Sequence, residues 1–252
     1  MAKIAIITGA TGGLGTEFTR MINSYDDIDE IWAVGRNREK LDSLKAAYNK
    51  VVPICADFSD GGLESIVQKL EEEKPDVRLL INNAGAGFFG KYENIDSGKV
   101  DELCNINCTV PAVLISVTLP YMQEGAGILN ISSASSFQPN PYLALYSASK
   151  VFVKNLSRAL SVELKPRKIQ VTSVCPGWID TDMLPREKDG KKINYMGMIS
   201  AKKVAEKALS DNRKGKDMST PGFFSKYFRL YSKVIPTGIV MKQWSKIIGK
   251  YI

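Results

Sequence analysis

Short apolar runs alternate with longer amphipathic stretches along the first 174 residues of the chain. The apolar runs, which we expect to be buried strands, are residues 3–8, 30–34, 51–56, 79–82, 127–132 and 169–174. The stretches with apolar residues at helical spacing are residues 14–24, 38–48, 63–73, 98–119 and 145–164. This alternation is typical of a doubly wound α/β fold, in which helices cover both faces of a parallel sheet. Ligands of such sheets bind at the carboxyl ends of the strands.

The end of the chain has a different pattern. Residues 218–252 contain six Lys/Arg and no Asp/Glu. Two apolar stripes at helical spacing lie on either side of Pro236, the first made of Phe223, Phe224, Tyr227, Phe228, Tyr231, Val234 and Ile235, the second of Val240, Trp244, Ile247, Ile248 and Tyr251. We therefore expect a main domain, 1–217, and a basic amphipathic helical extension, 218–252. Three partners for the extension stay open: the protein's own body, a membrane surface contacted through 223–252, and a second subunit in a homodimer.

Composition excludes several kinds of chemistry. The chain has no histidine, so neither a Ser-His-Asp hydrolase nor any other histidine-based acid–base mechanism is available to it. The cysteines Cys55, Cys104, Cys108 and Cys175 are scattered, and without histidine we expect no metal site. We also expect a cytoplasmic protein, because we find no signal-peptide pattern and no apolar run long enough for a transmembrane helix.

The net charge of +7 is unevenly distributed along the chain. Residues 186–252 contain 16 Lys/Arg against 5 Asp/Glu, whereas residues 1–185 contain 18 against 22. The larger part of the protein is therefore mildly acidic. This distribution is not typical of a nucleic-acid-binding domain, and we expect no nucleic-acid partner.

A glycine-rich segment joins the first expected strand to the first expected helix. It contains Gly9, Thr11, Gly12, Gly13, Leu14 and Gly15. Glycine allows a tight turn and a close approach of the backbone to a ligand, and the N-terminus of the following helix attracts a pyrophosphate. The segment therefore predicts a dinucleotide site. Arg36 lies just after the second expected strand, where an acidic residue would bind the 2′-hydroxyl of NAD, so we expect NADP(H).

Four further segments carry a resemblance to a known family. They are Asn82-Asn83-Ala84-Gly85, Asn130-Ile131-Ser132-Ser133, Tyr146-Ser147-Ala148-Ser149-Lys150 and Pro176-Gly177. Together with the glycine loop, in this order and spacing, they resemble the short-chain dehydrogenase/reductase family over roughly residues 3–185. The resemblance implies a Rossmann fold. Many members of that family end in a strand and a glycine-rich segment that support a tetramer, and the pattern here predicts no such ending.

The resemblance also implies a role for each matching residue. The catalytic set would be Tyr146 as general acid/base, Lys150 as its activator, Ser133 as the hydroxyl that orients the substrate, and Asn107, preferred to Asn105, as the side chain that holds a relay water. The cofactor contacts would be Asp57 at the adenine, Asn83, Ala84 and Gly85 beside the adenosine ribose, Lys150 at the ribose, and Pro176, Gly177 and Thr181 beside the nicotinamide.

Physical chemistry supports the central pair. Tyr146 and Lys150 are four residues apart in a helical stretch, so they share one face. A free tyrosine has a pKa of about 10, and we expect the neighbouring ammonium to lower it towards the working pH. Ser133, at the end of a strand, would donate to a substrate oxygen.

The expected function is that of an NADP(H)-dependent oxidoreductase, or carbonyl reductase, that interconverts a ketone or aldehyde and an alcohol. The segment 183–200 should face the substrate, and its apolar side chains predict a small hydrophobic substrate; they are Met183, Leu184, Tyr195, Met196 and Met198. Two alternatives stay open, a hydroxysteroid dehydrogenase and a catalytically silent NADP-binding scaffold. An epimerase of the same fold is disfavoured by the short substrate segment.

Overall fold

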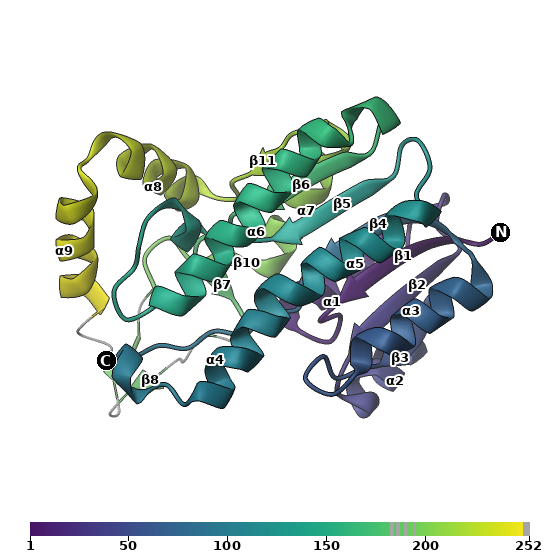
Figure 1. Ribbon diagram of the computed structural model, residues 1–252, viewed down its shortest axis with the longest axis horizontal. Helices are drawn as coiled ribbons and strands as arrows, with labels where there is room; N and C mark the ends of the chain where they lie inside the picture. The colour runs from purple at the N-terminus through teal and green to yellow at the C-terminus, as the bar shows by residue number, and fades with distance from the viewer. Residues whose placement is uncertain (182–183, 185–186, 189–190, 194, 249–252) are drawn as a thin grey trace.

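A seven-stranded parallel sheet forms the centre of the protein in the computed structural model, which describes residues 1–181, 184, 187–188, 191–193 and 195–248. The strand order is β11-β6-β5-β4-β1-β2-β3 (Figure 1). The strands are β1 (Lys3–Thr8), β2 (Glu30–Gly35), β3 (Val51–Cys55), β4 (Asp76–Asn82), β5 (Gly127–Ile131), β6 (Gln170–Val174) and β11 (Met218–Ser219). The first six confirm the strands expected from the apolar runs.

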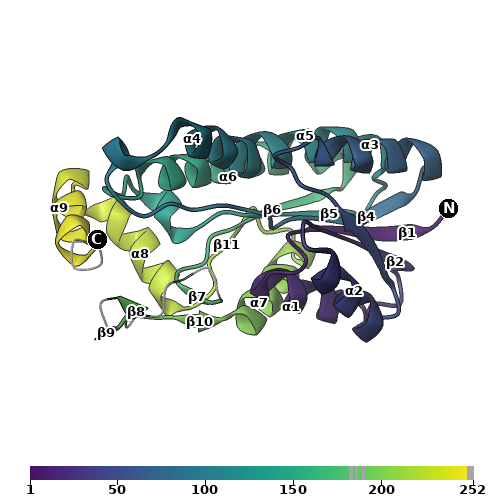
Figure 2. The ribbon, with the colours of Figure 1, turned by 90° about the horizontal axis from the view of Figure 1, so that it is seen from below.

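Helices cover both faces of this sheet, as the alternation predicted. In Figure 2, α3 to α6 lie on one face and α1, α2 and α7 on the other. The helices are α1 (Gly13–Ile22), α2 (Arg38–Ala47), α3 (Gly62–Glu73), α4 (Ser97–Cys104), α5 (Val110–Thr118), α6 (Ala144–Glu163), α7 (Ala201–Arg213), α8 (Phe223–Val234) and α9 (Thr237–Ile248). Two-residue strands, β7 (Ile179–Asp180), β8 (Glu187–Lys188), β9 (Lys191–Lys192) and β10 (Ile199–Ser200), lie between β6 and α7.

The alternation of side chains along β1 shows why the sheet needs two helical layers. Ile4 and Ile6 belong to one hydrophobic core, whereas Ala5 and Ile7 belong to a second core on the opposite face. All four are fully buried. A strand whose two faces are both apolar is stable only between two layers, which is the typical arrangement of parallel sheets.

A row of polar side chains crosses this apolar interior. Asn82 of β4 and Asn130 of β5 are register partners, and Asn82 Nδ2 donates to Asn130 Oδ1 at 2.8 Å. Asn130 Nδ2 in turn donates to Ser157 Oγ of α6 at 2.9 Å. Because buried amides are costly without partners, the row fixes how α6 sits on the sheet.

The stretch expected as one helix over 98–119 is divided. A π-helical turn, Asn105–Thr109, separates α4 from α5. The whole segment Ser97–Tyr121 is long and apolar enough to cross a membrane by length and composition, contrary to our expectation that no such run exists. Of its apolar window 39% is buried, Leu103, Leu114 and Ile115 among the buried residues, and the segment packs against β4 and α6.

Two elements near the C-terminus correct the sequence analysis. No helix was assigned to 201–213, where α7 lies, and no terminal strand was expected, although Met218 and Ser219 pair with β6 as the parallel edge strand. A strand of two residues is too short to show any periodicity. The first two residues of the expected extension are therefore part of the sheet.

A buried carboxylate connects α7 to this edge strand. Asp211 is 2% exposed, accepts a hydrogen bond from Ser219 Oγ at 2.8 Å, and pairs with Lys216 at 2.9 Å and with Lys207. Burial raises the pKa of its carboxyl, but hydrogen bonds from the two lysines and the serine outweigh that effect and lower the pKa below its usual value of 3.8.

We expect Asp211→Asn to lower the free energy of unfolding by about 2–4 kcal/mol at neutral pH, measured by urea denaturation, because two ammonium groups lose their counter-charge. The folded pKa lies below the unfolded one, so the carboxylate's contribution is complete above about pH 5 and is lost as pH falls through 3.8 towards the folded pKa. The control is Asp217→Asn, which removes an exposed pair with Arg158 and should cost less than about 1 kcal/mol. Equal losses in both variants would contradict this account.

Candidate active site at the carboxyl edge of the sheet

The glycine loop packs directly against the segment that follows β4. Gly9 has a φ of 63°, and a Cβ there would lie 3.0 Å from Ala84 Cα. A Cβ on Gly15 would lie only 2.1 Å from the carbonyl oxygen of Gly9. A side chain at Gly9 would push the loop away from the segment after β4, and one at Gly15 would push α1 away from the loop, so both glycines are required by close packing.

The N-terminus of α1 has the properties of an anion site. Its cap is Gly12, which provides no side-chain hydrogen bond, and its first turn carries no acidic residue. Gly12 and Gly13 are exposed, whereas Leu14 is buried against the core. The positive end of the helix dipole is thus open to a phosphate that approaches the loop.

Two other segments meet the glycine loop. Thr11 packs against Gly35: a Cβ built on Gly35 would lie 3.2 Å from Thr11 Oγ1. This contact places the glycine loop at the end of β2, beside Arg36. Thr181 lies at Gly13, with Thr181 Cγ2 2.9 Å from the corresponding Cβ position. The structure therefore brings together residues that are far apart in the sequence at one side of the expected dinucleotide site.

Thr8, which the sequence analysis did not single out, connects the loop to β4. Its hydroxyl accepts hydrogen bonds from the backbone N–H groups of Asn83 and Ala84, each at 3.0 Å. Asn83 Nδ2 donates to the carbonyls of Thr8 and Gly9, each at 3.0 Å. Asn83 thus shapes the glycine loop through its own side chain. The role of Thr8 could have been inferred from the sequence, because it is a hydroxyl residue at the last position of the first strand, directly before Gly9.

Arg36 and Asp57 lie further out along the same edge. Arg36 follows β2 and is exposed. Asp57 follows β3, is exposed, and accepts a hydrogen bond from the N–H of Ser59 at 2.9 Å. The two residues therefore follow the strands β2 and β3, which lie next to β1 at one side of the sheet.

Ser133, Tyr146 and Lys150 form a cluster on the other side of the glycine loop. The Ser133 side chain lies close enough to the Tyr146 phenol to lower the pKa of that phenol. Lys150 Nζ lies 5.6 Å from the centre of the Tyr146 ring and donates to the carbonyl of Ile131 at 2.9 Å. Ser132 Oγ donates to the carbonyl of Lys150 at 2.7 Å, so the strand and helix that carry the cluster are joined beside it.

Gly85 and Asn107 complete the surroundings of Lys150. A Cβ on Gly85 would lie 3.2 Å from Lys150 Nζ and 3.3 Å from Asn107 Oδ1. Asn107 Oδ1 accepts from Ala86 N–H at 2.8 Å, and Asn107 Nδ2 donates to the Ala86 carbonyl and to Ser149 Oγ, each at 2.9 Å. The π-helical turn presents this side chain to the cluster, and such turns are frequent at functional sites.

Asn105, the alternative that was set aside, has a different role. Its Nδ2 donates to the carbonyl of Phe58 at 2.7 Å, which ties the turn to the loop after β3. Asn107 is therefore the asparagine that lies beside Lys150.

The protonation of the central pair differs from the expectation. Burial lowers the pKa of Lys150 to about 8, so its ammonium is still mostly charged at pH 7. The pKa of Tyr146 is raised, because loss of hydration outweighs the hydrogen bond with Ser133. The expectation that Lys150 lowers the pKa of Tyr146 was therefore wrong, because burial is the largest effect on that phenol.

Pro176 and Gly177 place the loop after β6 against the cluster and the extension. The Pro176 carbonyl accepts from the N–H of Ala134, next to Ser133, at 2.7 Å. A Cβ on Gly177 would lie 3.1 Å from Phe224 Cδ1, at the beginning of α8. The first helix of the extension is thus packed on the loop that borders the site.

An aromatic group follows directly on this loop. Trp178 is stacked with Phe89 at 6.4 Å and with Trp244 of α9 at 6.3 Å, and its ring lies 4.9 Å from that of Tyr195. Trp244 Nε1 donates to the carbonyl of Pro141 at 2.9 Å. We call Phe89, Trp178, Tyr195 and Trp244 the aromatic wall.

The aromatic wall borders the cluster of Ser133, Tyr146 and Lys150 through two short connections. Phe89 is two residues from Gly87, where a Cβ would lie 3.4 Å from Tyr146 Cδ2, and Trp178 is two residues from Pro176. The sequence analysis missed Phe89 and Trp178. Of the expected substrate segment, Met183 lies outside the described residues, Leu184 is buried, and Met196 and Met198 are exposed.

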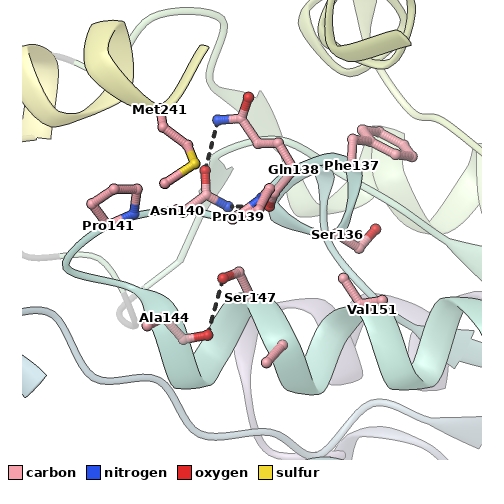
Figure 3. A pocket seen from close by; sticks show the side chains of 11 residues that line it. Ser136, Phe137, Gln138, Pro139, Asn140, Pro141, Ala144, Ser147, Val151 and Met241 are labelled. Carbon is pink, nitrogen blue, oxygen red and sulfur yellow. Dashed lines mark hydrogen bonds between the residues drawn. The ribbon is translucent and has the colours of Figure 1, made fainter. Parts of the chain in front are cut away.

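A cavity of about 600 Å³ lies between α6, residues 136–141 and Met241 of α9 (Figure 3). Gln138 Nε2 donates to Asn140 Oδ1 at its wall. The α6 residues that line it, Ser147 and Val151 among them, lie on a different face from Tyr146 and Lys150. This cavity is therefore a space between the extension and the main domain, beside the catalytic cluster.

Comparison with known proteins agrees with this geometry. Residues 3–192 match the family model described as short chain dehydrogenase. A very-long-chain 3-oxoacyl-CoA reductase of Anas platyrhynchos is 33% identical over 193 residues, which cover 71% of this chain and 60% of the relative. A human (Homo sapiens) protein named inactive hydroxysteroid dehydrogenase-like protein 1 is 31% identical over 191 residues, which cover 71% of this chain and 56% of the relative.

The fold is also that of a solved short-chain dehydrogenase from Sphingobium yanoikuyae in complex with NADPH. The two superpose with a TM-score of 0.79, at 23% identity, over 92% of this chain and 93% of the other. With the family match spanning most of its length, the chain belongs to the short-chain dehydrogenases.

Proposed function

We propose that this protein is an NADP(H)-dependent carbonyl reductase that interconverts a hydrophobic ketone or aldehyde and the corresponding alcohol. The observation that carries the proposal is the convergence of Ser133, Tyr146 and Lys150 beside the glycine loop. A dinucleotide bound at that loop would end near the cluster, which is the arrangement that hydride transfer to a carbonyl carbon requires.

The residues of the cluster divide the proton chemistry between them. Bound NADPH supplies the hydride. Tyr146 donates a proton to the carbonyl oxygen as negative charge develops there, and Ser133 holds that oxygen by a hydrogen bond. The Lys150 ammonium then stabilises the phenolate that remains. In the oxidation direction Tyr146 accepts the proton instead.

The glycine loop and its neighbours are the proposed cofactor site. The open N-terminus of α1, with Gly12 and Gly13, suits the pyrophosphate. Arg36 suits a 2′-phosphate, Asp57 the adenine, and Asn83, Ala84 and Gly85 the adenosine ribose. Lys150 suits the second ribose, and Pro176, Gly177 and Thr181 the nicotinamide. The Sphingobium neighbour, which contains NADPH, supports the same choice of cofactor.

The aromatic wall supports a hydrophobic substrate. Phe89 is 37% exposed, so its ring is open to solvent beside the cluster. The relative from Anas platyrhynchos is named for a 3-oxoacyl-CoA, a ketone with a long apolar chain. A hydroxysteroid substrate fits the same wall, because flat apolar rings stack on aromatic side chains. We keep the cytoplasm as the proposed location.

The silent-scaffold alternative has a counterpart in the human relative, which is named as inactive. The site argues against it here, because a scaffold has no need of a lysine 95% buried beside a tyrosine. An ammonium in that place is costly and is best explained by a reaction that uses its charge.

We expect Tyr146→Phe to lower kcat for ketone reduction at least about 100-fold while the Kd for NADPH stays unchanged, because only the proton donor is removed. NADPH oxidation followed by absorbance and NADPH titration by fluorescence provide the two readouts. Tyr121→Phe, at a tyrosine of the 3-10 turn after α5, is the matched control and should leave both values unchanged. Full turnover in Tyr146→Phe would refute the proposed mechanism.

We expect Arg36→Ala to raise the KM for NADPH about 10- to 100-fold and to leave that for NADH nearly unchanged, because charge-assisted bonds to a phosphate are worth about 1.5–3 kcal/mol. Arg38→Ala is the control, since Arg38 is also exposed but pairs with Asp42 on α2. A preference of the native protein for NADH would show that the role assigned to Arg36 is wrong.

We expect Trp244→Ala to raise the KM for aromatic and polycyclic ketones about tenfold or more, with little change for small aliphatic ketones, because one face of the aromatic wall is lost. Trp244→Phe keeps the stacking but loses the bond to Pro141, and should retain most of the affinity. Ile247→Ala, at an exposed position of the same helix, is the control. An equal loss for all ketones would indicate that Trp244 only holds α9 in place.

A further inference from the structure

The outer face of the extension carries large apolar side chains that nothing in the described part of the protein covers. Phe223, Tyr227, Leu230 and Val234 of α8 are 83%, 53%, 64% and 69% exposed. They follow one another at intervals of four, three and four residues, so they form a single stripe along the helix. We call these four residues the outer stripe.

The opposite face of the extension already accounts for its packing on the main domain. Ser225 is 1% exposed, and Phe224 lies against Gly177 and Gly197. On α9, Val240 and Ile248 are 2% and 3% exposed. The extension is therefore attached through one face, as one of the three open alternatives proposed, and the fold does not need the outer stripe.

Exposed lysines accompany the outer stripe. Lys226 and Lys233 lie on α8 along one side of it, and Lys242 and Lys246 are exposed on α9. No acidic residue occurs anywhere in 218–252, whereas residues 1–185 carry more acidic than basic groups. An exposed apolar stripe with lysines along its side is complementary to a surface that is apolar inside and negatively charged outside.

We propose that α8 and α9 dock on the surface of a membrane that contains anionic phospholipids, with the outer stripe in the boundary between headgroups and acyl chains. Each lysine near such a surface contributes about 1 kcal/mol, and the apolar side chains supply the rest. A second copy of this chain fits less well, because two identical basic faces would repel each other across the contact.

The extension lies beyond the carboxyl edge of the sheet, at the same end of the protein as β7 and β10 (Figure 1). Trp244 on its inner side belongs to the aromatic wall. Docking through the outer stripe would therefore keep the wall close to the lipid, from which a hydrophobic substrate could enter; this consequence, unlike the docking itself, rests on the proposed function.

The test is co-sedimentation of the full-length protein with phosphatidylcholine vesicles, with and without phosphatidylserine. We expect binding to the vesicles with phosphatidylserine that weakens as salt is added. Leu230→Asp should lower the bound fraction about tenfold or more, whereas Val162→Asp, at an apolar residue 71% exposed on α6, should not. Lys226→Glu with Lys233→Glu should weaken binding, and Lys202→Glu with Lys203→Glu on α7 should not.

Three outcomes of this test would overturn the docking proposal. Equal binding of the native protein and Leu230→Asp would exclude the outer stripe, and no binding to either vesicle would exclude the membrane. A dimer in light scattering that dissociates in Leu230→Asp, without vesicle binding, would assign the face to a second copy. Circular dichroism and turnover of a water-soluble ketone confirm that the variants are folded. Binding without turnover would refute only the proposed reaction.

Discussion

The close approach of Gly15 to the carbonyl of Gly9 is the contact on which the site depends. It lets α1 begin immediately behind β1, so that the open end of the helix faces the carboxyl edge of the sheet. The same tight turn leaves room for Asn83 to donate to Gly9 and for Thr181 to reach Gly13. A side chain at Gly15 would displace the helix, and the loops after β4 and β6 would lose their common neighbour. Backbone geometry, more than any charged group, therefore brings the proposed cofactor site and the catalytic cluster together.

Burial shifts the pKa values of the central pair in opposite directions. It raises the pKa of Tyr146 and lowers that of Lys150 to about 8. Proton transfer involving such groups depends on their being held in a fixed geometry. The rigid surroundings matter for the same reason. Asn107 bonds both to the loop after β4 and to α6, and the row from Asn82 through Asn130 to Ser157 anchors that helix on the sheet. These bonds keep the donor at a constant place while the charges around it change.

Most of the sheet could be predicted from the sequence, because strands with two apolar faces stand out as continuous runs such as residues 3–8. The glycine loop was predictable from its place between a strand and a helix, whereas Tyr146 and Lys150 were singled out by the family resemblance, with their shared helix face as physical support. The rest depends on tertiary contacts that leave no local pattern. Helix α7 is an exception, because its buried residues Ala201, Val204, Ala205, Ala208 and Leu209 follow helical spacing, and the sequence analysis overlooked that pattern. The π-helical turn is one extra residue in a long helix, and its effect on Asn107 is visible only in three dimensions. The aromatic wall combines four rings from segments far apart in the sequence, and only Trp244 and Tyr195 had been noticed, for other reasons.

In the extension, helix α8 has to pack on the main domain through one side and, under our proposal, to contact a membrane through the other. A helix that only had to cover the main domain would be apolar on that side and polar on the other. On α8 the inner side chains Phe224 and Ser225 fulfil that demand, yet the outer stripe is apolar as well. A stripe of this kind favours aggregation in a water-soluble protein unless a partner covers it for part of the time. The lysines beside it act against aggregation, because they repel other copies of the chain, and they attract an anionic surface. Both properties follow from the same residues, so the charge that keeps the free protein dispersed is also the charge that would select a membrane over another protein.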